Sequence, residues 1–92
     1  MTLDWTGPAR ADIQAIDVHL SQYSPERAAR LLEAILATAD ILEAYPAIGP
    51  ALDEATRSLR VRHSPYILLY RIRQPVVQIL RVRHEREDWR TI

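Results

Sequence analysis

The residues best suited to chemistry lie in the segment RVRHEREDW near the C-terminal end of the chain. His84 or Glu85 could act as a general base, and Arg81 or Arg86 could bind a phosphate. Trp89 could stack on a nucleobase. Together these groups are those of a metal-independent phosphodiesterase. The alternative is a solvated strand end whose charges pair with each other, with Trp89 packed on the core; such structural ion pairs are commoner than functional sites.

Other kinds of site are excluded by residue type and spacing. His19 and His63 lie far from His84 in the sequence, and no two histidines have the close spacing of a zinc pair. Cysteine is absent, which excludes disulfides and thiolate ligands. The two glycines, Gly7 and Gly49, do not form a phosphate-binding loop, and there is no glycine-flanked serine nucleophile. We therefore expect neither a metal ion nor another cofactor.

The balance of charge limits the partners that the chain can bind. Twelve basic residues, all of them arginine, balance twelve acidic residues. A protein that works mainly by gripping nucleic acid usually has a basic excess, so any basic patch here must be local. Arginine suits carboxylates and phosphates because its planar guanidinium donates two parallel hydrogen bonds. A compositional bias of the genome nevertheless explains the exclusive use of arginine more simply.

Length and hydropathy indicate a single soluble domain. The 92 residues are enough for one modest core, and the hydrophobic fraction of 48% is that of an ordinary globular protein. No apolar run approaches the ~20 residues of a membrane span. Asp4, Arg10 and Asp12 interrupt the start of the chain before the apolar core of a signal peptide could form. We expect a cytoplasmic protein that does not contact a membrane.

The segment that could do chemistry must be positioned by strands. Three short apolar runs, at residues 57–62, 66–73 and 76–83, are separated by turns that contain proline. The first run alternates, with Leu59 and Val61 on one face. The second begins with apolar residues on both faces, as a covered central strand does. A sheet of this size is stable only if an apolar layer covers one face, and the rest of the chain must supply that layer.

The third run bears directly on the candidate site, because its faces decide where the charges lie. Its end alternates, with Leu80 and Val82 on one face and Arg81 and Arg83 on the other. A shift of register by one residue would exchange the two faces. The register stays open, because Pro75 does not suit the usual two-residue hairpin turns.

Local signals place an edge strand and two helices before this sheet. Residues 2–5 form a short extended segment, and Thr6 is the expected N-cap of a first helix with Pro8 in its first turn. Ser24 caps a second helix that begins at Pro25 and runs to about Tyr45. The connection is short, so the two helices form an antiparallel hairpin.

The pattern predicts an α+β fold. A short N-terminal strand is followed by an antiparallel helical hairpin that packs on a C-terminal antiparallel β-meander. Both helices carry apolar residues at helical spacing. We expect burial between the helices and the sheet of Ile13, Ile16, Leu20, Leu31, Ile35 and Leu42.

Several pieces of the chain resemble the ParE branch of the RelE/ParE toxin family. They are Trp5-Thr6, Tyr45-Pro46 with Gly49, Pro65-Tyr66 through Tyr70-Arg71, and Leu80-Arg81-Val82 with His84 and Asp88. The similarity covers almost the whole chain, and the succession of pieces is more specific than any one of them. It implies a single RelE/ParE-like domain over residues 1–92, with the helical hairpin on an antiparallel sheet.

The resemblance implies the toxin of a type II toxin–antitoxin module, of the kind linked to plasmid stabilisation and growth inhibition. ParE-like members inhibit DNA gyrase by binding and are not enzymes. RelE-like members are ribosome-dependent endoribonucleases that cut mRNA without a metal. A third possibility is a degenerate member that only binds its antitoxin. The neutral charge, the tail HEREDW and the lack of the lysine-rich strand pair of the RNA-cutting branch favour gyrase.

The resemblance also indicates which residues bind the target. They are Arg60, Arg71, Arg81, Arg83, His84, Arg86 and Trp89. If the chain is a nuclease, His84, Arg81 and Arg86 carry the chemistry. The implied partners are a cognate antitoxin and either gyrase or the ribosome with mRNA, and operator DNA is reached only through the antitoxin. We expect the antitoxin to cover the exposed helix stripes and the sheet edge, with its acidic groups against arginines.

Overall fold

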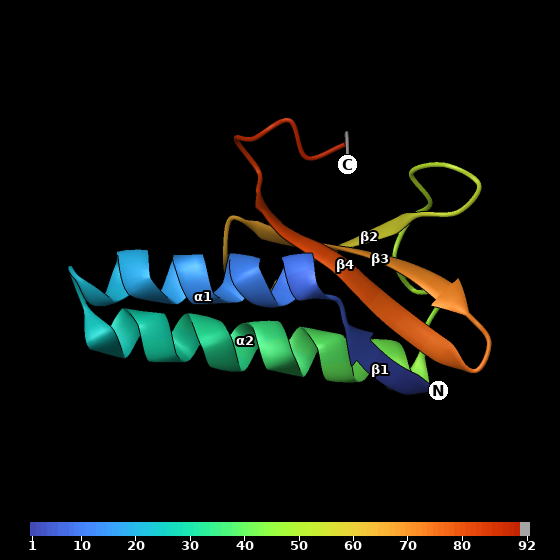
Figure 1. Cartoon of the computed structure of the whole chain (residues 1–92), viewed down its shortest axis with the longest axis horizontal. Helices are drawn as coiled ribbons and strands as arrows, with labels where there is room; N and C mark the ends of the chain where they lie inside the picture. Colours follow the sequence, from blue (N-terminus) through green and yellow to red (C-terminus); the bar gives the residue numbers. More distant parts are fainter. Residues whose placement is uncertain (91–92) are drawn as a thin grey trace.

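The computed structural model describes residues 1–90, and its elements follow the predicted order (Figure 1). The elements are β1 (Thr2–Trp5), α1 (Gly7–Ser21), α2 (Pro25–Ala44), β2 (Arg57–Arg60), β3 (Tyr66–Arg73) and β4 (Val76–His84). The predicted α+β class is confirmed, with the helical hairpin followed by an antiparallel strand meander. No helix in the described part of the chain is long and apolar enough to cross a membrane.

Both helices begin at the predicted caps. The Thr6 side chain accepts a hydrogen bond from the Ala9 amide at 3.3 Å, and the Ser24 side chain accepts one from the Arg27 amide at 3.2 Å. A proline lies in the first turn of each helix, where its missing amide hydrogen costs no hydrogen bond. These local signals therefore fix the start of each helix.

The sheet has the strand order β1-β4-β3-β2. β2 pairs with β3, and β3 with β4, in the antiparallel direction, as predicted. β1 is an edge strand, also as predicted, but it pairs with β4 in parallel, with Leu3 opposite Val77. The sequence pattern did not indicate this pairing, because the paired residues lie 74 positions apart in the sequence.

The register of β4 contains one irregularity that changes the predicted faces. Leu69 lies opposite Arg81, but the next residue of β3, Tyr70, lies opposite Ile79. Leu80 is therefore an extra residue in β4, as in a β-bulge. The predicted shared face of Leu80 and Val82 is wrong: across the bulge, the buried Val82 shares the core face with Ile79, whereas Leu80 is only half-buried. The first apolar run also ends sooner than predicted, since β2 stops at Arg60.

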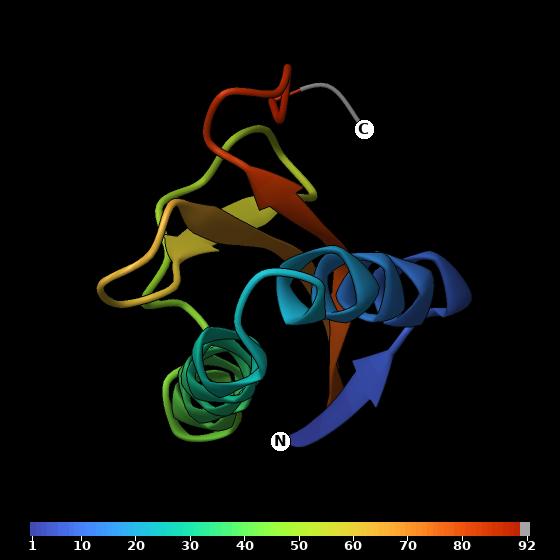
Figure 2. The ribbon, with the colours of Figure 1, turned by 90° about the vertical axis from the view of Figure 1, so that its left-hand side faces the viewer.

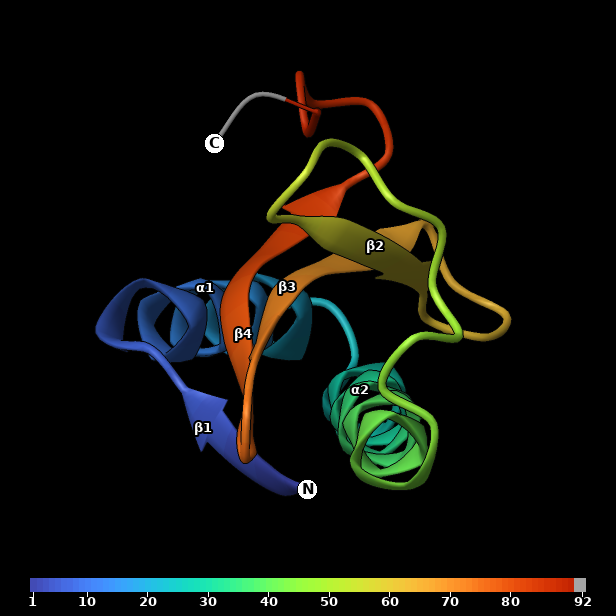
Figure 3. The ribbon, with the colours of Figure 1, turned by 90° about the vertical axis from the view of Figure 1, so that its right-hand side faces the viewer.

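The core lies between the hairpin and one face of the sheet. α2 lies in the concavity of the twisted sheet and α1 lies beside β4 (Figures 2 and 3). Ile35 and Leu42 are fully buried, as expected, whereas Leu20 is half-buried. The other expected helix residues pack against the core while partly exposed; they are Ile13, Ile16 and Leu31.

The long loop between α2 and β2 is held against the sheet by Tyr70. The Tyr70 hydroxyl donates a hydrogen bond to the Pro46 carbonyl at 2.7 Å and accepts one from the Gly49 amide at 3.0 Å. Arg57 donates to the Gly49 carbonyl at 2.8 Å. A Cβ atom at Gly49 would collide with the Ser58 carbonyl oxygen. A glycine is therefore required where the loop touches the sheet.

Candidate functional site

Four of the predicted target-binding residues lie on one face of the sheet. Residues directly opposite each other on paired strands share a face. Ile67 lies opposite both Arg60 and Arg83, and Leu69 lies opposite Arg81. Arg71 follows Leu69 at the two-residue spacing of one face. These four arginines thus lie on the sheet face opposite the core, which we call the outer face, and Arg81 reaches from its β4 edge to α1.

His84 does not join them. It lies opposite Tyr66, which is on the helix-facing side of the sheet with Leu68 and Tyr70. The His84 and Tyr66 rings meet edge to face, with 5.2 Å between their centroids. The structure therefore separates the candidate base from the arginine face.

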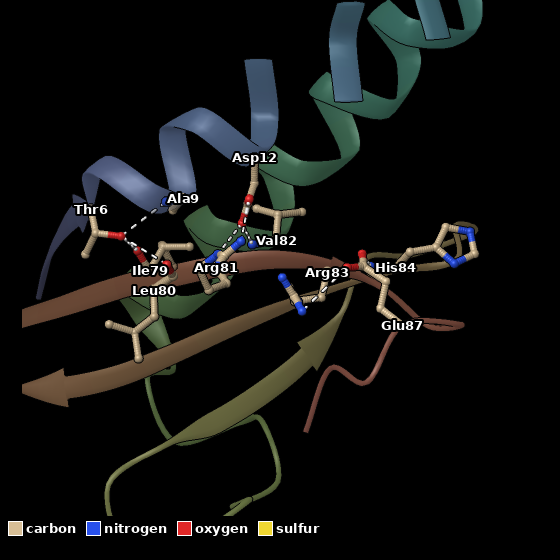
Figure 4. A network of polar contacts seen from close by, with 10 residues as sticks. All are labelled: Thr6, Ala9, Asp12, Ile79, Leu80, Arg81, Val82, Arg83, His84 and Glu87. Carbon is tan, nitrogen blue, oxygen red and sulfur yellow. Dashed lines mark hydrogen bonds and ion pairs between the residues drawn. The ribbon is translucent and has the colours of Figure 1, made fainter. Parts of the chain in front are cut away.

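The edge of β4 that β1 does not cover is hydrogen-bonded by side chains of Thr6 and Asp12 (Figure 4). The Thr6 hydroxyl donates to the carbonyls of Ile79 at 2.9 Å and Leu80 at 3.1 Å. The Asp12 carboxylate accepts from the Val82 amide at 2.9 Å. These contacts join the start of the hairpin to the strand that carries the candidate site.

Arg81 is committed to Asp12. Its Nε and Nη2 atoms donate to the two Asp12 carboxylate oxygens at 2.8 and 2.9 Å. The hydrogen bonds that Arg81 donates to Asp12 raise the pKa of its guanidinium above the usual value. Because this two-pronged contact uses the side of the guanidinium that would grip a phosphate, a phosphate could bind there only by displacing Asp12.

The other outer-face arginines are also paired within the chain. Arg60 contacts Glu85 at 2.7 Å, Arg83 contacts Glu87 at 3.5 Å, and Arg71 donates to Gln78 at 2.6 Å. The Gln78 amide in turn donates to Asp4 at 3.1 Å. The groups that neutralise or engage these arginines come partly from nearby residues, such as Glu87 for Arg83, and partly from distant ones, such as Asp12 for Arg81.

The hydrogen bond at His84 decides which of its nitrogens carries the proton. Nδ1 accepts a hydrogen bond from the Arg86 amide at 3.1 Å. In the neutral ring the proton is then assigned to Nε2, which makes Nε2 a donor rather than a proton acceptor. Next to it, burial and the charge of Glu87 raise the pKa of the Tyr66 hydroxyl, so this group stays protonated.

The remaining predicted residues lie in the tail after β4. Arg86 is exposed, and Trp89 is half-buried with the Arg90 guanidinium 4.4 Å from its ring centre. The tail leaves the end of β4 on the side away from the helices (Figure 1). Within residues 1–90, no group of three histidine, cysteine or acidic side chains is arranged to hold a metal ion.

Sequence reasoning missed Asp12 and Glu87 as partners of the candidate residues. Asp12 is one polar residue among several on α1, and its partners are 69 and 70 positions away. Of the two, only Glu87 could have been found from the charge pattern, because it stands four residues after Arg83. The role of Asp12 depends on the packing of α1 along β4, for which no local pattern exists.

Comparison with known proteins identifies the family. A family model described as the ParE toxin of the type II toxin–antitoxin system parDE matches residues 3–89. Toxin Y4kP of Sinorhizobium fredii is 36% identical over 86 residues, which cover 92% of this chain and 88% of that protein. Toxin RelE2 of Caulobacter vibrioides is 36% identical over 80 residues, which cover 87% and 90%.

A solved structure agrees with these sequence relatives. The chromosomal ParDE toxin–antitoxin system from P. aeruginosa contains a chain that is 30% identical, with a TM-score of 0.79 over 91% of this chain and 95% of that one. The family match spans nearly all the described residues and includes both the outer face and the β4 edge. The chain therefore belongs to the ParE toxin family of type II toxin–antitoxin systems, and a toxin of this kind has a cognate antitoxin as its partner.

Proposed function

We propose that the protein inhibits DNA gyrase by binding to it and catalyses no reaction. RNA cleavage needs a proton acceptor at the ribose hydroxyl and a free cation at the phosphate. The observation that carries the proposal is the two-pronged Arg81–Asp12 contact, which occupies the cation best placed on β4. The assigned tautomer of His84, with its proton on Nε2, supports the same conclusion.

The binding surface that we propose is the outer face together with the tail. The Arg60–Glu85 pair is exposed, and such a pair contributes only ~0.2–1 kcal/mol. Arg60 can therefore exchange Glu85 for a carboxylate of the target at little cost. Arg86 and Trp89 extend this surface beyond the strands, and arginine and tryptophan are the residue types that dominate binding energies. A gyrase inhibitor acts in the cytoplasm.

One observation favours a second candidate, ribosome-dependent cleavage of mRNA. A relative with 36% identity is named RelE2. On that alternative His84 would be the base and Arg81 and Arg86 would hold the phosphate. The ring of His84 would first have to move its proton to Nδ1, and Arg81 would have to leave Asp12.

The two candidates predict different effects of the same substitution. In a gyrase supercoiling assay, we expect the purified protein to inhibit and His84→Ala to weaken inhibition by less than about tenfold, since only contacts are lost. Arg86→Ala or Trp89→Ala should weaken inhibition at least as much. Arg10→Ala, on the exposed side of α1, is the matched control.

The nuclease alternative makes the opposite prediction. Purified protein would cut mRNA on ribosomes, and His84→Ala would lower the cutting rate by ~10²–10⁴, the usual loss of a general acid or base. Cleavage that depends on His84, with no effect on supercoiling, would overturn the gyrase proposal.

A further inference from the structure

The middle of the side of α1 that faces away from the core carries no charge. Residues at helical spacing form it, and all of them are exposed; they are Ala11, Gln14, Ala15, Val18 and Gln22. We call these five residues the uncharged face. The exposed positions of α2 differ, since many are charged; they include Glu26, Arg27, Arg30, Glu33, Asp40 and Glu43. A helix face in water ordinarily carries charged residues, so the uncharged face is suited to contact with protein.

The uncharged face has a shape that can fit a copy of itself. A hollow of about 450 Å³ lies along it, lined by the five residues and by His19. Val18 is 57% exposed and is the largest aliphatic side chain of the face, whereas Ala11 and Ala15 are small. The face therefore has a projecting side chain toward one end and room for such a side chain toward the other. Two copies that lie antiparallel can fill each other's hollow, as in a two-fold symmetric contact.

The charges beside the uncharged face are also self-complementary. Arg10 and Asp17 lie seven residues apart on one flank of it, at a spacing that keeps both on the same side of the helix. Arg10 is exposed and forms no ion pair with another described residue. Among the described residues, the Asp17 carboxylate accepts a hydrogen bond only from the Ser21 hydroxyl, at 3.2 Å. In an antiparallel pair of helices each Arg10 comes beside Asp17 of the other copy, so both ion pairs form together.

The shape and the charges place the two-fold axis at nearly the same point. The midpoint between Ala11 and Val18 lies between residues 14 and 15, and the midpoint between Arg10 and Asp17 lies between residues 13 and 14. One arrangement of two helices satisfies both, because a shift of one residue is only about 1.5 Å along the helix axis. This symmetry within a single helix favours a second copy of the chain over an unrelated partner.

We propose that the uncharged face binds a second copy of the chain through an antiparallel pair of α1 helices. Val18 of each copy lies against Ala11 of the other, and Gln14 and Ala15 lie at the axis. α1 has 15 residues and is about 22 Å long, so the contact is smaller than a standard protein interface and the dimer is weak. The outer face is on the opposite side of the sheet from the core, so the dimer leaves it open. The inference does not depend on the proposed function.

The first test measures the association of the purified toxin by analytical ultracentrifugation. Wild-type protein should pass from monomer toward dimer between ~10 µM and ~1 mM. Asp17→Arg should weaken the dimer at least about tenfold, because two attractive pairs become two repulsive ones. Arg10→Asp/Asp17→Arg, which exchanges the charges, should bring the affinity back to within about threefold of the wild type. Asp40→Arg, the same charge reversal at an exposed position of α2, is the matched control.

The exchange of charges separates a specific contact from a general effect of net charge, and melting temperatures check that each variant folds. A wild type that stays monomeric at ~1 mM would overturn the inference. An exchange variant that is as weak as Asp17→Arg would also overturn it. Equal effects of Asp17→Arg and Asp40→Arg would show that α1 is not the contact.

The second test uses the absence of cysteine from the chain. Ala15→Cys places a thiol beside the axis, close enough to the same thiol of the other copy for a disulfide. Ala11→Cys is the matched control, because its two thiols would lie about 10 Å apart along the helices, seven positions at ~1.5 Å each. Under mild oxidation, Ala15→Cys should give at least about tenfold more linked dimer than Ala11→Cys. Equal yields would show that the copies meet without a fixed register and would contradict the arrangement.

The same cysteine variant identifies any other occupant of the uncharged face. In the dimer, the thiol of Ala15→Cys should react more slowly with a maleimide as the toxin concentration rises. A rate that is independent of toxin concentration but falls when the purified antitoxin is added would assign the face to the antitoxin and overturn the inference. The gyrase supercoiling assay reports on the outer face and the tail, so its result decides the proposed function separately.

Discussion

At the scale of single residues, the state of a group depends on neighbours that are distant in the sequence. The residue types of the candidate site could be predicted, because charge, imidazole and tryptophan are concentrated in nine residues. Their hydrogen-bond partners and the face on which each side chain lies could not be predicted. Arg81 is engaged by a carboxylate 69 residues away, and a bulge and a strand pairing decide that His84 faces the helices. These are consequences of tertiary packing, which leaves no local pattern.

The Tyr70 hydroxyl contributes to stability through contacts with residues that are distant in the sequence. Tyr70 is completely buried, and burial raises the pKa of its hydroxyl, so the group remains a donor to the Pro46 carbonyl. Tyr70→Phe would keep the ring but leave the Gly49 amide and the Pro46 carbonyl without this partner. We expect a loss of about 1–3 kcal/mol in the free energy of unfolding, measured by urea denaturation.

The control for this prediction is Tyr45→Phe. Tyr45 is 67% exposed, and removal of its hydroxyl should leave the free energy of unfolding within about 0.5 kcal/mol of the wild type. Equal effects of the two substitutions would show that the Tyr70 hydroxyl does not hold the loop.

At the scale of elements, prediction succeeded where the signal is local. The caps Thr6 and Ser24 and the bounds of β3 follow from neighbouring residues, and the structure confirms them. The parallel pairing of β1 with β4 and the extra residue Leu80 are set by contacts between elements. The alternation of apolar and charged residues therefore predicted the strand and the opposite faces of Val82 and of Arg81 and Arg83, but not the position of Leu80.

The packing of α2 gives a direct test of the core. Ile35 and Leu42 are fully buried, whereas Leu36 on the same helix is 53% exposed. Ile35→Ala and Leu42→Ala should each lower the free energy of unfolding by ~2–5 kcal/mol, because each leaves a cavity under the sheet. Leu36→Ala should cost well under half as much. Unchanged melting temperatures for both buried substitutions would contradict this packing.

At the scale of the whole molecule, Asp12 joins the two ends of the chain. It accepts hydrogen bonds from the Arg81 side chain and from the Val82 amide, and so fastens the N-terminal hairpin to the last strand. Asp12→Ala would leave a half-buried guanidinium and a strand amide without partners. We expect a loss of about 2–4 kcal/mol in the free energy of unfolding.

The exposed Asp40 of α2 provides the control, since Asp40→Ala removes the same charge at a position without such contacts. Its free energy of unfolding should change by no more than about 0.5 kcal/mol. If Asp12→Ala were equally mild in thermal or urea denaturation, the contact would not be the link between hairpin and sheet.

The place of β4 in the sheet has a consequence for folding of the protein during its synthesis on the ribosome. β4 lies between β1 and β3, yet it is synthesised after both of them. Until residues 76–84 emerge, β1 has no strand to pair with and the core lacks Val77, Ile79 and Val82. Contacts between such distant segments form late, after their loops close. The nascent chain therefore cannot complete the four-stranded sheet before residues 76–84 have been synthesised, and its N-terminal strand lacks its partner until then.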